Sequence, residues 1–416
     1  MLFKYIKKFS KRIISLTMAV YLVVSIFGIS YAENYEWTVI KNKDSLATNA
    51  TAQDEKGTVD ELNLDCESAI LIEQNSGQVL YEKNAHEQLR PASVTKLMTL
   101  LLIFEALDSG QIKLEDKVPC SQNAASMGGS QIWLDPREEL SVNEMVKAMC
   151  VVSANDCTVA MSEYIAGSEE AFVQKMNEKA KQLGMNDTCF KNCHGIDEDG
   201  HVTSSYDIAL MSRELLLHHP DITNYTTVYM DSLRDGKSSL VNTNKLIRNY
   251  KGATGLKTGS TSLALYNLSA SATRDNLSLI AVIMKAPTSN LRFENAKKLL
   301  DYGFKSYIYK QFAKKDDVVS NIPVFKGIQK DIDVVFETDA GVLVKKGEEG
   351  NVEQNMQIEK SLTAPVEKGQ KVGTVEYVLN GNVVATVNII ANSSVQKESF
   401  GEIVKYVYGN WFCLLR

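Results

Sequence analysis

The chain has few basic residues for its length. Its 416 residues include 45 lysines and arginines against 51 aspartates and glutamates. The first 32 residues hold five of the basic groups and no acidic ones, so the rest of the chain has 40 basic and 51 acidic residues, a net charge of −11. A chain this acidic lacks the basic surface of a general nucleic-acid-binding protein. We therefore expect no nucleic acid among its partners.

Long hydrophobic runs are also scarce, and the clearest extends from Ile13 to about Ile29. It follows a basic start and precedes small residues that end at Ala32. This order is typical of a secretory signal peptide, which we predict for residues 1–32, so we expect an exported protein of the cell envelope. The run is near the lower limit for spanning a bilayer, and an uncleaved anchor is the alternative. The polar residues 33–62 predict a flexible linker.

No second cluster of cysteines or histidines is present to complete a metal site. Cys189, Cys193 and His194 have the spacing C-x-x-x-C-H, but a structural zinc site needs further ligands elsewhere in the chain. We favour buried thiols or one disulfide for these two cysteines. Seven cysteines leave at least one unpaired within the chain. We expect no metal and no cofactor.

The central part of the chain begins and ends with strand patterns. Two apolar runs in "ESAILIEQNSGQVLYEKN" flank a turn and predict a β-hairpin. Helical patterns dominate residues 140–219, where Ser141 and Glu144 form a capping box, and strands return after residue 250. Strands at both ends with helices between them predict an α+β domain over 63–310 whose first and last strands meet.

The C-terminal part has a different pattern. Short strands with turn signals predict a small all-β domain at 311–392, with a hairpin turn at Asn380-Gly381. Residues 393–416 have apolar residues at helical spacing and predict an amphipathic terminal helix. From the pattern alone, a helix in a membrane interface and a helix docked on its own protein are equal alternatives.

Ser93 and Lys96 form an unusual pair at the start of a predicted helix. Three residues apart, they share one helical face. The positive end of the helix dipole disfavours a lysine there by roughly 0.3–1 kcal/mol. A serine hydroxyl is a weak nucleophile until a base takes its proton, and a lysine can do so only when neutral. The placement therefore favours a catalytic pair, although S-x-x-K alone is a weak motif.

Two further motifs strengthen this hypothesis. "VVSANDC" supplies Ser153 and Asn155, and "GLKTGST" supplies Lys257, Thr258 and Gly259. S-x-x-K, S-D-N and K-T-G occur together in class A β-lactamases and penicillin-binding proteins, and here the middle motif reads Ser153-Ala154-Asn155.

Each residue has an expected role in attack on a peptide carbonyl. Ser93 becomes acylated, Lys96 is its base, and Ser153 relays a proton to the leaving amine. We expect the remaining motif residues to bind substrate. Asn155 should hydrogen-bond the substrate amide, and Lys257 and Thr258 should bind its carboxylate. Gly259 should let the substrate approach the strand backbone closely. Lys257 also lowers the pKa of Lys96. The backbone N–H groups of Ser93 and Ser260 are the expected oxyanion hole.

With these motifs, the chain resembles the serine-type D-Ala-D-Ala carboxypeptidases, the low-molecular-mass penicillin-binding proteins. The likeness covers roughly Ser68 to Tyr309 and includes "RPASVTKLMT", "VSANDCTVAMSEYIAG", "NTNKLI" and "GLKTGST". The stretch "TAPVEKGQKVGTV" and the terminal amphipathic pattern also look like the C-terminal parts of this family. In relatives, that helix holds the enzyme on the outer face of the cytoplasmic membrane.

The resemblance implies a β-lactamase/transpeptidase-like fold, an antiparallel sheet flanked by helices, followed by a small all-β domain. It implies a peptidoglycan stem peptide ending in D-Ala-D-Ala as substrate, and an acyl-enzyme on Ser93 that water hydrolyses. It implies acylation by β-lactams as covalent inhibitors. It also implies that Arg292 lies near the substrate carboxylate, for which an ordinary surface charge is the alternative.

The chain departs from the family pattern at two positions. Relatives often read Ala-Gly after K-T-G, where this chain has Ala264-Leu265. Relatives often have small, glycine-rich residues at the end of the next strand, where this chain has Lys285-Ala286. We expect these differences to affect efficiency and substrate range rather than the type of reaction.

Two other classes of function are alternatives. A class A β-lactamase uses the same motifs but needs a glutamate for fast deacylation, and no E-x-x-x-N lies between Asn155 and Lys257. A non-catalytic module that binds β-lactams or peptidoglycan is the second alternative, and the three intact motifs argue against it. We expect His194, beside Gly195, to be structural rather than a base.

Overall fold

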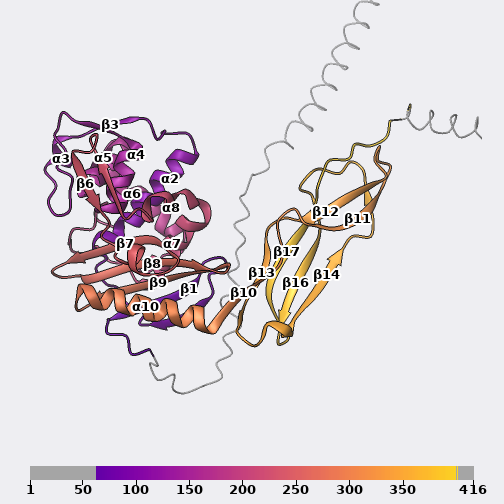
Figure 1. Cartoon of the computed structure of the whole chain (residues 1–416). Helices are drawn as coiled ribbons and strands as arrows, with labels where there is room; N and C mark the ends of the chain where they lie inside the picture. The colour runs from indigo at the N-terminus through magenta and orange to yellow at the C-terminus, as the bar shows by residue number, and fades with distance from the viewer. Residues whose placement is uncertain (1–61, 400, 402–416) are drawn as a thin grey trace, which may run out of the picture. The chain divides into compact units, whose positions relative to one another are not determined.

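The computed structural model describes residues 62–399 and residue 401. The predicted signal peptide (1–32), the linker (33–62) except its last residue, and residues 400 and 402–416 of the predicted terminal helix lie outside the described residues. The described chain forms a domain of helices and strands followed by an all-β domain, as predicted (Figure 1). No helix among these residues is long and apolar enough to cross a bilayer.

The first domain contains a five-stranded antiparallel sheet. Its strand order is β2-β1-β9-β8-β7. The strands are β1 (Ser68–Glu73), β2 (Val79–Lys83), β7 (Ala253–Thr261), β8 (Leu265–Arg274) and β9 (Leu277–Ala286). Ser68 of β1 pairs with Met284 of β9, which confirms that the first and last strands meet. Strand β7, which carries the K-T-G motif, lies at the sheet edge.

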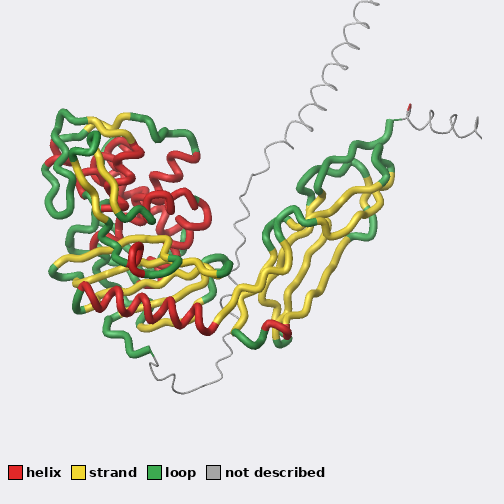
Figure 2. Tube along the Cα trace, viewed as in Figure 1, coloured by secondary structure: helices red, strands yellow, loops and turns green. Residues whose placement is uncertain are grey.

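Helices cover both faces of this sheet (Figure 2). Ile70 and Ile72 pack with the central helices, whereas Ala69 and Leu71 pack on the opposite face with α10 (Ser289–Ser306). This alternation follows from the two-residue period of a strand, and burial on both faces makes β1 continuously apolar. The central helices are α2 (Lys96–Asp108), α4 (Val142–Val151), α5 (Asn155–Ala166), α6 (Glu169–Gln182) and α7 (Ser205–His218).

Short elements connect these helices and strands. The capping box of α4 is confirmed: Ser141 Oγ accepts from Glu144 N at 3.3 Å, and Glu144 Oε2 accepts from Ser141 N at 2.9 Å. The short elements are a 3-10 turn (Ala92–Thr95), α3 (Gln122–Ala125), a 3-10 turn (Pro220–Ile222), α8 (Thr223–Thr226), α9 (Leu246–Asn249), and the strand pairs β3 (Lys117–Pro119) with β4 (Glu139–Ser141) and β5 (Met230–Leu233) with β6 (Ser238–Val241).

The second domain is built almost entirely from strands. Asn380 and Gly381 have φ values of +51° and +81° in the turn between β16 and β17, which confirms the predicted hairpin. Strands β10 and β13 form one pair, and the other six form a sheet in the order β14-β16-β17-β12-β11-β15. The elements are β10 (Tyr307–Ala313), β11 (Val318–Phe325), β12 (Asp331–Phe336), β13 (Ala340–Lys345), a 3-10 turn (Glu349–Asn351), β14 (Val352–Ile358), β15 (Leu362–Thr363), β16 (Lys371–Leu379) and β17 (Asn382–Ala391).

Two sequence-based limits differ from the structure. The expected boundary between residues 310 and 311 falls inside β10, which pairs with β13 along its length. The terminal helix expected from residue 393 is not present over 393–399, where Val395 pairs with Val366 and Lys397 with Gly327. Val395 is 2% exposed because it contributes to the core of the β domain. The apolar residues at helical spacing begin only at Phe400, so the limit at residue 393 assigned part of the β domain to the terminal helix.

The Cys189–Cys193 segment contains thiols. Cys193 is buried, and its Sγ donates to Glu169 Oε1 at 3.2 Å. Burial raises the pKa of this thiol well above its usual range, so the thiolate that a metal requires is disfavoured. No cluster of histidines, cysteines or carboxylates within residues 62–399 has the arrangement of a metal site.

Candidate active site

Ser93 lies in the 3-10 turn immediately before α2. The predicted helix starts with the Ser93–Lys96 pair, whereas in the structure Ser93 lies in the 3-10 turn and the α-helix begins at Lys96; such a tightening is common at helix starts. Ala92 has a left-handed φ of +50°, which costs a non-glycine residue about 1–2 kcal/mol. The turn is closely packed: a Cβ on Gly195 would lie 1.9 Å from Ala92 O. Glycine at 195 therefore lets the loop that carries His194 contact the serine turn directly.

Lys96 is fully buried and lies against three oxygen atoms. Its Nζ is 3.1 Å from Ser93 Oγ, 2.6 Å from Asn155 Oδ1 and 2.7 Å from His194 O. A neutral amine has two hydrogens and one lone pair. The amide and carbonyl oxygens only accept, so they take the two hydrogens and leave the lone pair for the Ser93 hydroxyl hydrogen. This is the geometry of a base beside its nucleophile.

The surroundings of Lys96 favour its neutral form. Burial lowers the pKa of Lys96 well below its ordinary value, and the positive charge of Lys257 lowers it further. Cys193 and Asp156 act in the opposite direction on the same pKa. Desolvation disfavours an ammonium more than an amine, so the interior position of this helix start prepares the lysine to accept a proton.

Ser153 joins α4 to α5 and is in a strained conformation. Its φ is +66°, it is 4% exposed, and its Oγ has no hydrogen-bond partner among the described residues. A buried hydroxyl without a partner costs about 1–3 kcal/mol. Strained backbone and an unsatisfied hydroxyl occur together at functional positions more often than elsewhere, because a bound substrate can supply the missing partner.

Asn155 contacts Lys96. Its Oδ1 accepts from Lys96 at 2.6 Å, and its Nδ2 donates to Gly128 O at 2.7 Å. Both ends of the side-chain amide therefore have partners within the protein, whereas the motif predicts that this amide binds substrate. In this structure, Asn155 orients Lys96.

Lys257 and Thr258 lie on the edge strand β7. Lys257 is 1% exposed, and its Nζ donates to Thr258 O at 3.0 Å. Burial lowers the pKa of Lys257 to about 7; Cys150 opposes this shift and Arg292 adds to it. Thr258 Oγ1 is 2.7 Å from Thr243 Oγ1. The motif therefore supplies an ammonium and a hydroxyl on consecutive residues of one strand, two kinds of group that can bind an anion.

Gly259 brings β7 against the serine turn. A Cβ at this residue would lie 2.8 Å from Pro91 O and 2.9 Å from Ser93 N. The next residue in the strand, Ser260, is exposed. The structure thus brings the S-x-x-K and K-T-G segments into direct contact, as the sequence analysis expects.

Arg292 is not a surface charge. It is 7% exposed in α10, and its Nη1 donates to Gly259 O at 3.1 Å and Asn267 O at 3.3 Å. Its Nε has no partner among the described residues, and burial lowers its pKa to about 10. The guanidinium therefore supports the backbone of β7 and β8 beside the K-T-G motif.

Sequence reasoning misses several contacts that complete the site. His194 contributes its carbonyl oxygen to Lys96, while its Nδ1 accepts from Ile196 N at 3.1 Å. Burial lowers the pKa of His194 to about 3, so the ring is neutral and agrees with a structural role. Gly128 O and Ser130 O accept from the side chain and the backbone of Asn155, both at 2.7 Å. Every residue type has a backbone carbonyl, so the sequence gives no signal for these contacts. The glycine pair in "MGGS" indicates only that another segment approaches this backbone closely.

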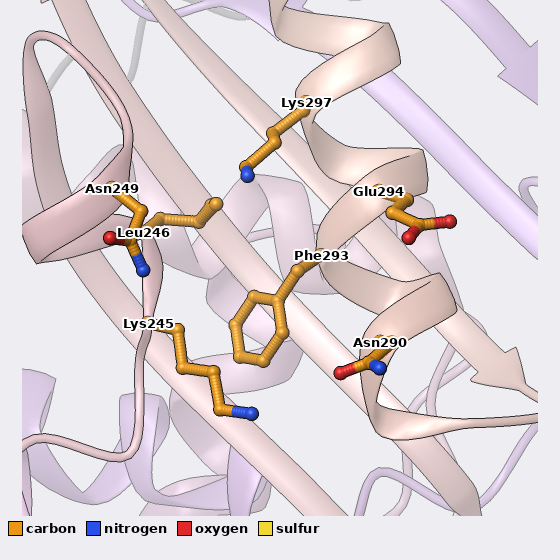
Figure 3. A pocket seen from close by; sticks show the side chains of 7 residues that line it. All are labelled: Lys245, Leu246, Asn249, Asn290, Phe293, Glu294 and Lys297. Carbon is orange, nitrogen blue, oxygen red and sulfur yellow. The ribbon is translucent and has the colours of Figure 1, made fainter.

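A small cavity of about 140 Å³ lies between α9 and α10 (Figure 3). Lys245 lies near the ring of Phe293, with its Nζ 5.9 Å from the ring centroid. None of the motif residues lines this cavity, so it is separate from the catalytic group. Its lining residues are Lys245, Leu246, Asn249, Asn290, Phe293, Glu294 and Lys297.

The fold and the three motifs together define a penicillin-recognising serine enzyme. Comparison with known families agrees: the D-alanyl-D-alanine carboxypeptidase model matches residues 52–288, and the penicillin-binding protein 5 C-terminal domain matches residues 307–397. The D-alanyl-D-alanine carboxypeptidase DacF of Bacillus subtilis is 45% identical over 371 residues, which cover 88% of this chain and 95% of that protein. DacC of Escherichia coli is 33% identical and covers 85% and 92% respectively.

Solved structures show the same likeness. Penicillin-binding protein 5 from Haemophilus influenzae has a TM-score of 0.68 at 31% identity and covers 80% of this chain and 98% of its own. Penicillin-binding protein D2 from Listeria monocytogenes, in its ampicillin-bound form, has a TM-score of 0.55 at 31% identity, covering 59% and 99%. The chain belongs to the D-alanyl-D-alanine carboxypeptidase family, and it is a serine-type carboxypeptidase.

Proposed function

We propose that this carboxypeptidase removes the terminal D-Ala of peptidoglycan stem pentapeptides through an acyl-enzyme on Ser93. The 3.1 Å distance from Lys96 Nζ to Ser93 Oγ carries this proposal, since the lysine is buried beside a second cation. Its neutral amine has its two hydrogens bound to Asn155 and His194 oxygens, and its lone pair is available to Ser93.

The proposed reaction has two steps. Ser93 Oγ attacks the carbonyl carbon of the penultimate D-Ala, and its proton passes to Lys96 Nζ. The peptide C–N bond then breaks, and the terminal D-Ala leaves with a proton relayed through Ser153. Water hydrolyses the Ser93 ester and restores the hydroxyl. The N–H groups of Ser93 and Ser260 stabilise the oxyanion in both steps, at about 3–4 kcal/mol per donor.

Substrate recognition rests on the edge strand. We assign the terminal carboxylate to Lys257 and Thr258, because their ammonium and hydroxyl belong to consecutive residues of the strand that contacts the serine turn. Arg292 acts through the carbonyl of Gly259 and keeps β7 in position.

The test is release of D-alanine from a pentapeptide that ends in D-Ala-D-Ala. The wild-type protein should release it, and Ser93→Ala should abolish release. Ser121→Ala is the matched control, because Ser121 begins a rival S-x-N match but caps α3 through Ala124 N. Release that survives Ser93→Ala would sink the proposal.

We also propose that β-lactams acylate Ser93 and remain bound. The ampicillin-bound structure of the Listeria relative supports this reaction, as does the match to a penicillin-binding family. A fluorescent penicillin should stay on the protein through gel electrophoresis. Rapid drug turnover would favour the β-lactamase alternative, and labelling without D-alanine release would favour a non-catalytic binding module.

We propose that the protein is exported and held at the outer face of the cytoplasmic membrane. The N-terminal apolar run and the amphipathic pattern at the C-terminus support this localisation. Truncation after residue 399, which keeps Val395 in the β domain, should move the protein from the membrane fraction to the soluble one. Continued membrane binding would locate the anchor elsewhere.

A further inference from the structure

Trp133 has the highest fractional exposure among the large exposed hydrophobic residues described. Its side chain is 77% exposed, and its φ is +55°. A left-handed conformation costs a residue other than glycine about 1–2 kcal/mol. The exposed indole therefore does not contribute to the core. The strained backbone that carries it needs strong local contacts to keep its conformation.

Two charged side chains, one of them fully buried, supply these contacts. The fully buried Asp156 accepts through Oδ2 from Ile132 N at 3.0 Å and from Leu134 N at 3.1 Å, the amides on either side of Trp133. Arg234 donates from Nη1 to Ile132 O at 2.9 Å and from Nη2 to Trp133 O at 3.4 Å. The backbone on both sides of the indole is therefore fixed.

The ring itself is oriented by a neighbour. With the Gln131 amide oriented to satisfy both of its ends, its oxygen accepts from Trp133 Nε1 at 3.3 Å and its nitrogen donates to Met127 O at 2.6 Å. The polar edge of the indole has a partner within the loop. The two apolar faces of the ring are left for contact with a ligand.

The loop that holds Trp133 belongs to the catalytic site. Gly128 O and Ser130 O bond to Asn155, and Asp156 follows Asn155 directly. Because Leu134 N touches the Asp156 carboxylate, standard backbone dimensions place Trp133 Cα within about 6 Å of that carboxylate. Asn155 also bonds to Lys96, whose Nζ is 3.1 Å from Ser93 Oγ, so two side chains link this loop to the nucleophile. The four residues of the pentapeptide on the acyl side of the scissile bond span at most about 14 Å.

We propose that Trp133 is a specificity residue that packs against the sugar to which the stem peptide is attached. This inference rests on the proposed function. Lys257 and Thr258 bind the D-Ala end of the peptide, so the sugar is the most distant part of the substrate. A fixed indole whose polar edge is already bonded suits the apolar C–H face of a hexose. The peptide portion alone does not need this contact.

A substrate series tests the proposal. D-Alanine release is measured with an acylated tripeptide, a free pentapeptide and a disaccharide pentapeptide, each ending in D-Ala-D-Ala. Trp133→Ala should lower kcat/KM about tenfold for the disaccharide pentapeptide, the scale of one buried aromatic contact, and leave the two peptides unchanged. Trp133→Phe should recover part of the loss. Tyr164→Ala, at a residue 38% exposed in α5, is the matched control.

Two further measurements separate contact from folding and from the proposed function. Trp133→Gly removes the ring and relieves the positive φ, so its Tm should not fall below that of wild type while the same substrate defect remains. In a Ser93→Ala, Trp37→Phe, Trp411→Phe protein, the disaccharide pentapeptide should change the fluorescence of the remaining Trp133.

The contradicting outcomes are specific. An equal loss on all three substrates, or no loss on any, would overturn the sugar contact even if D-alanine release itself is confirmed. Loss of vesicle binding in Trp133→Ala with unchanged kinetics would overturn it in favour of a membrane contact. Absence of D-alanine release by the wild-type protein on every substrate is instead a failure of the proposed function.

Discussion

Gly259 and Ser93 are in backbone contact. A Cβ at residue 259 would lie 2.9 Å from Ser93 N, and the same atom would lie 2.8 Å from Pro91 O. Ser93 and the strand to which we assign the substrate carboxylate therefore keep their spacing only because residue 259 has no side chain.

Gly259→Ala should consequently impair the enzyme. The added methyl group must push β7 away from the serine turn, at a cost of about 1–3 kcal/mol in stability. We expect the rate of Ser93 acylation by penicillin to fall at least tenfold, measured by stopped-flow or quenched labelling. Gly350→Ala is the control, because a Cβ there meets nothing within 4 Å and the residue lies in the β domain. Equal acylation rates in the two variants would contradict the close-contact account.

Lys257 should make stability depend on pH. Burial lowers its folded-state pKa to about 7 from an ordinary value of 10.5. Below pH 7, both folded and unfolded states hold the proton, so the cost of burying the charge is fully present. As pH rises from about 7 to 10.5, the folded state is deprotonated first and this cost disappears. Lys257→Met should therefore stabilise the protein most below pH 7, by an amount that shrinks as pH rises.

Urea unfolding at pH 6 and pH 9 measures this difference. Leu256→Met, in the same strand and 2% exposed, is the uncharged control and should show a difference from wild type that is independent of pH. A stability gain of Lys257→Met that is the same at both pH values would mean that Lys257 is not desolvated as described.

The same variant should change how acylation depends on pH. Acylation requires neutral Lys96, so its rate should rise with pH through the Lys96 pKa and then level off. The positive charge of Lys257 lowers the pKa of Lys96, and its removal should move the rising limb to higher pH. Maximal acylation rates at saturating β-lactam, measured from pH 5 to 10, test this. A rising limb that moves to lower pH would contradict the coupling.

Leu265 and Lys285 lie at the two positions where the sequence departs from the expected family pattern, and both have positive φ, at +53° and +55°. The left-handed region disfavours a leucine, so Leu265→Gly relieves backbone strain in the folded state. It also raises the conformational entropy of the unfolded chain, which partly offsets this gain. We expect a net stabilisation of up to about 1 kcal/mol. Leu263→Gly, two residues earlier and without positive φ, should destabilise by about 0.5–1 kcal/mol. Thermal unfolding measures the stability of both variants. An equal loss of stability in the two would contradict the claim that Leu265 is strained.

Local rules predicted a large part of the fold from sequence. The capping box at Ser141 and Glu144 and the hairpin turn at Asn380-Gly381 are interactions within a few residues, so spacing alone indicates them. The Ser93–Lys96 pair is also local, and only its combination with the two distant motifs indicated chemistry.

Long-range backbone contacts were not predictable in the same way. The carbonyl oxygen of His194 bonds to Lys96 across 98 residues of chain, and a carbonyl is common to every residue type. The backbone amides of Ile132 and Leu134, which donate to Asp156, likewise leave no residue-type signal in the sequence. The stretch 393–399 has one apolar residue, Val395, and its packing in the core of the β domain is a long-range contact that the local pattern does not indicate.

The central claim is that Ser93 is the nucleophile and Lys96 its base, and the position of the acyl group tests it most directly. The full chain is incubated with penicillin, digested, and analysed by peptide mass spectrometry. The account predicts one adduct, on Ser93, which is absent in Ser93→Ala and forms at least a hundredfold more slowly in Lys96→Met, on the scale of general-base catalysis. An adduct on Ser153 or another residue, or an unchanged acylation rate in Lys96→Met, would contradict it.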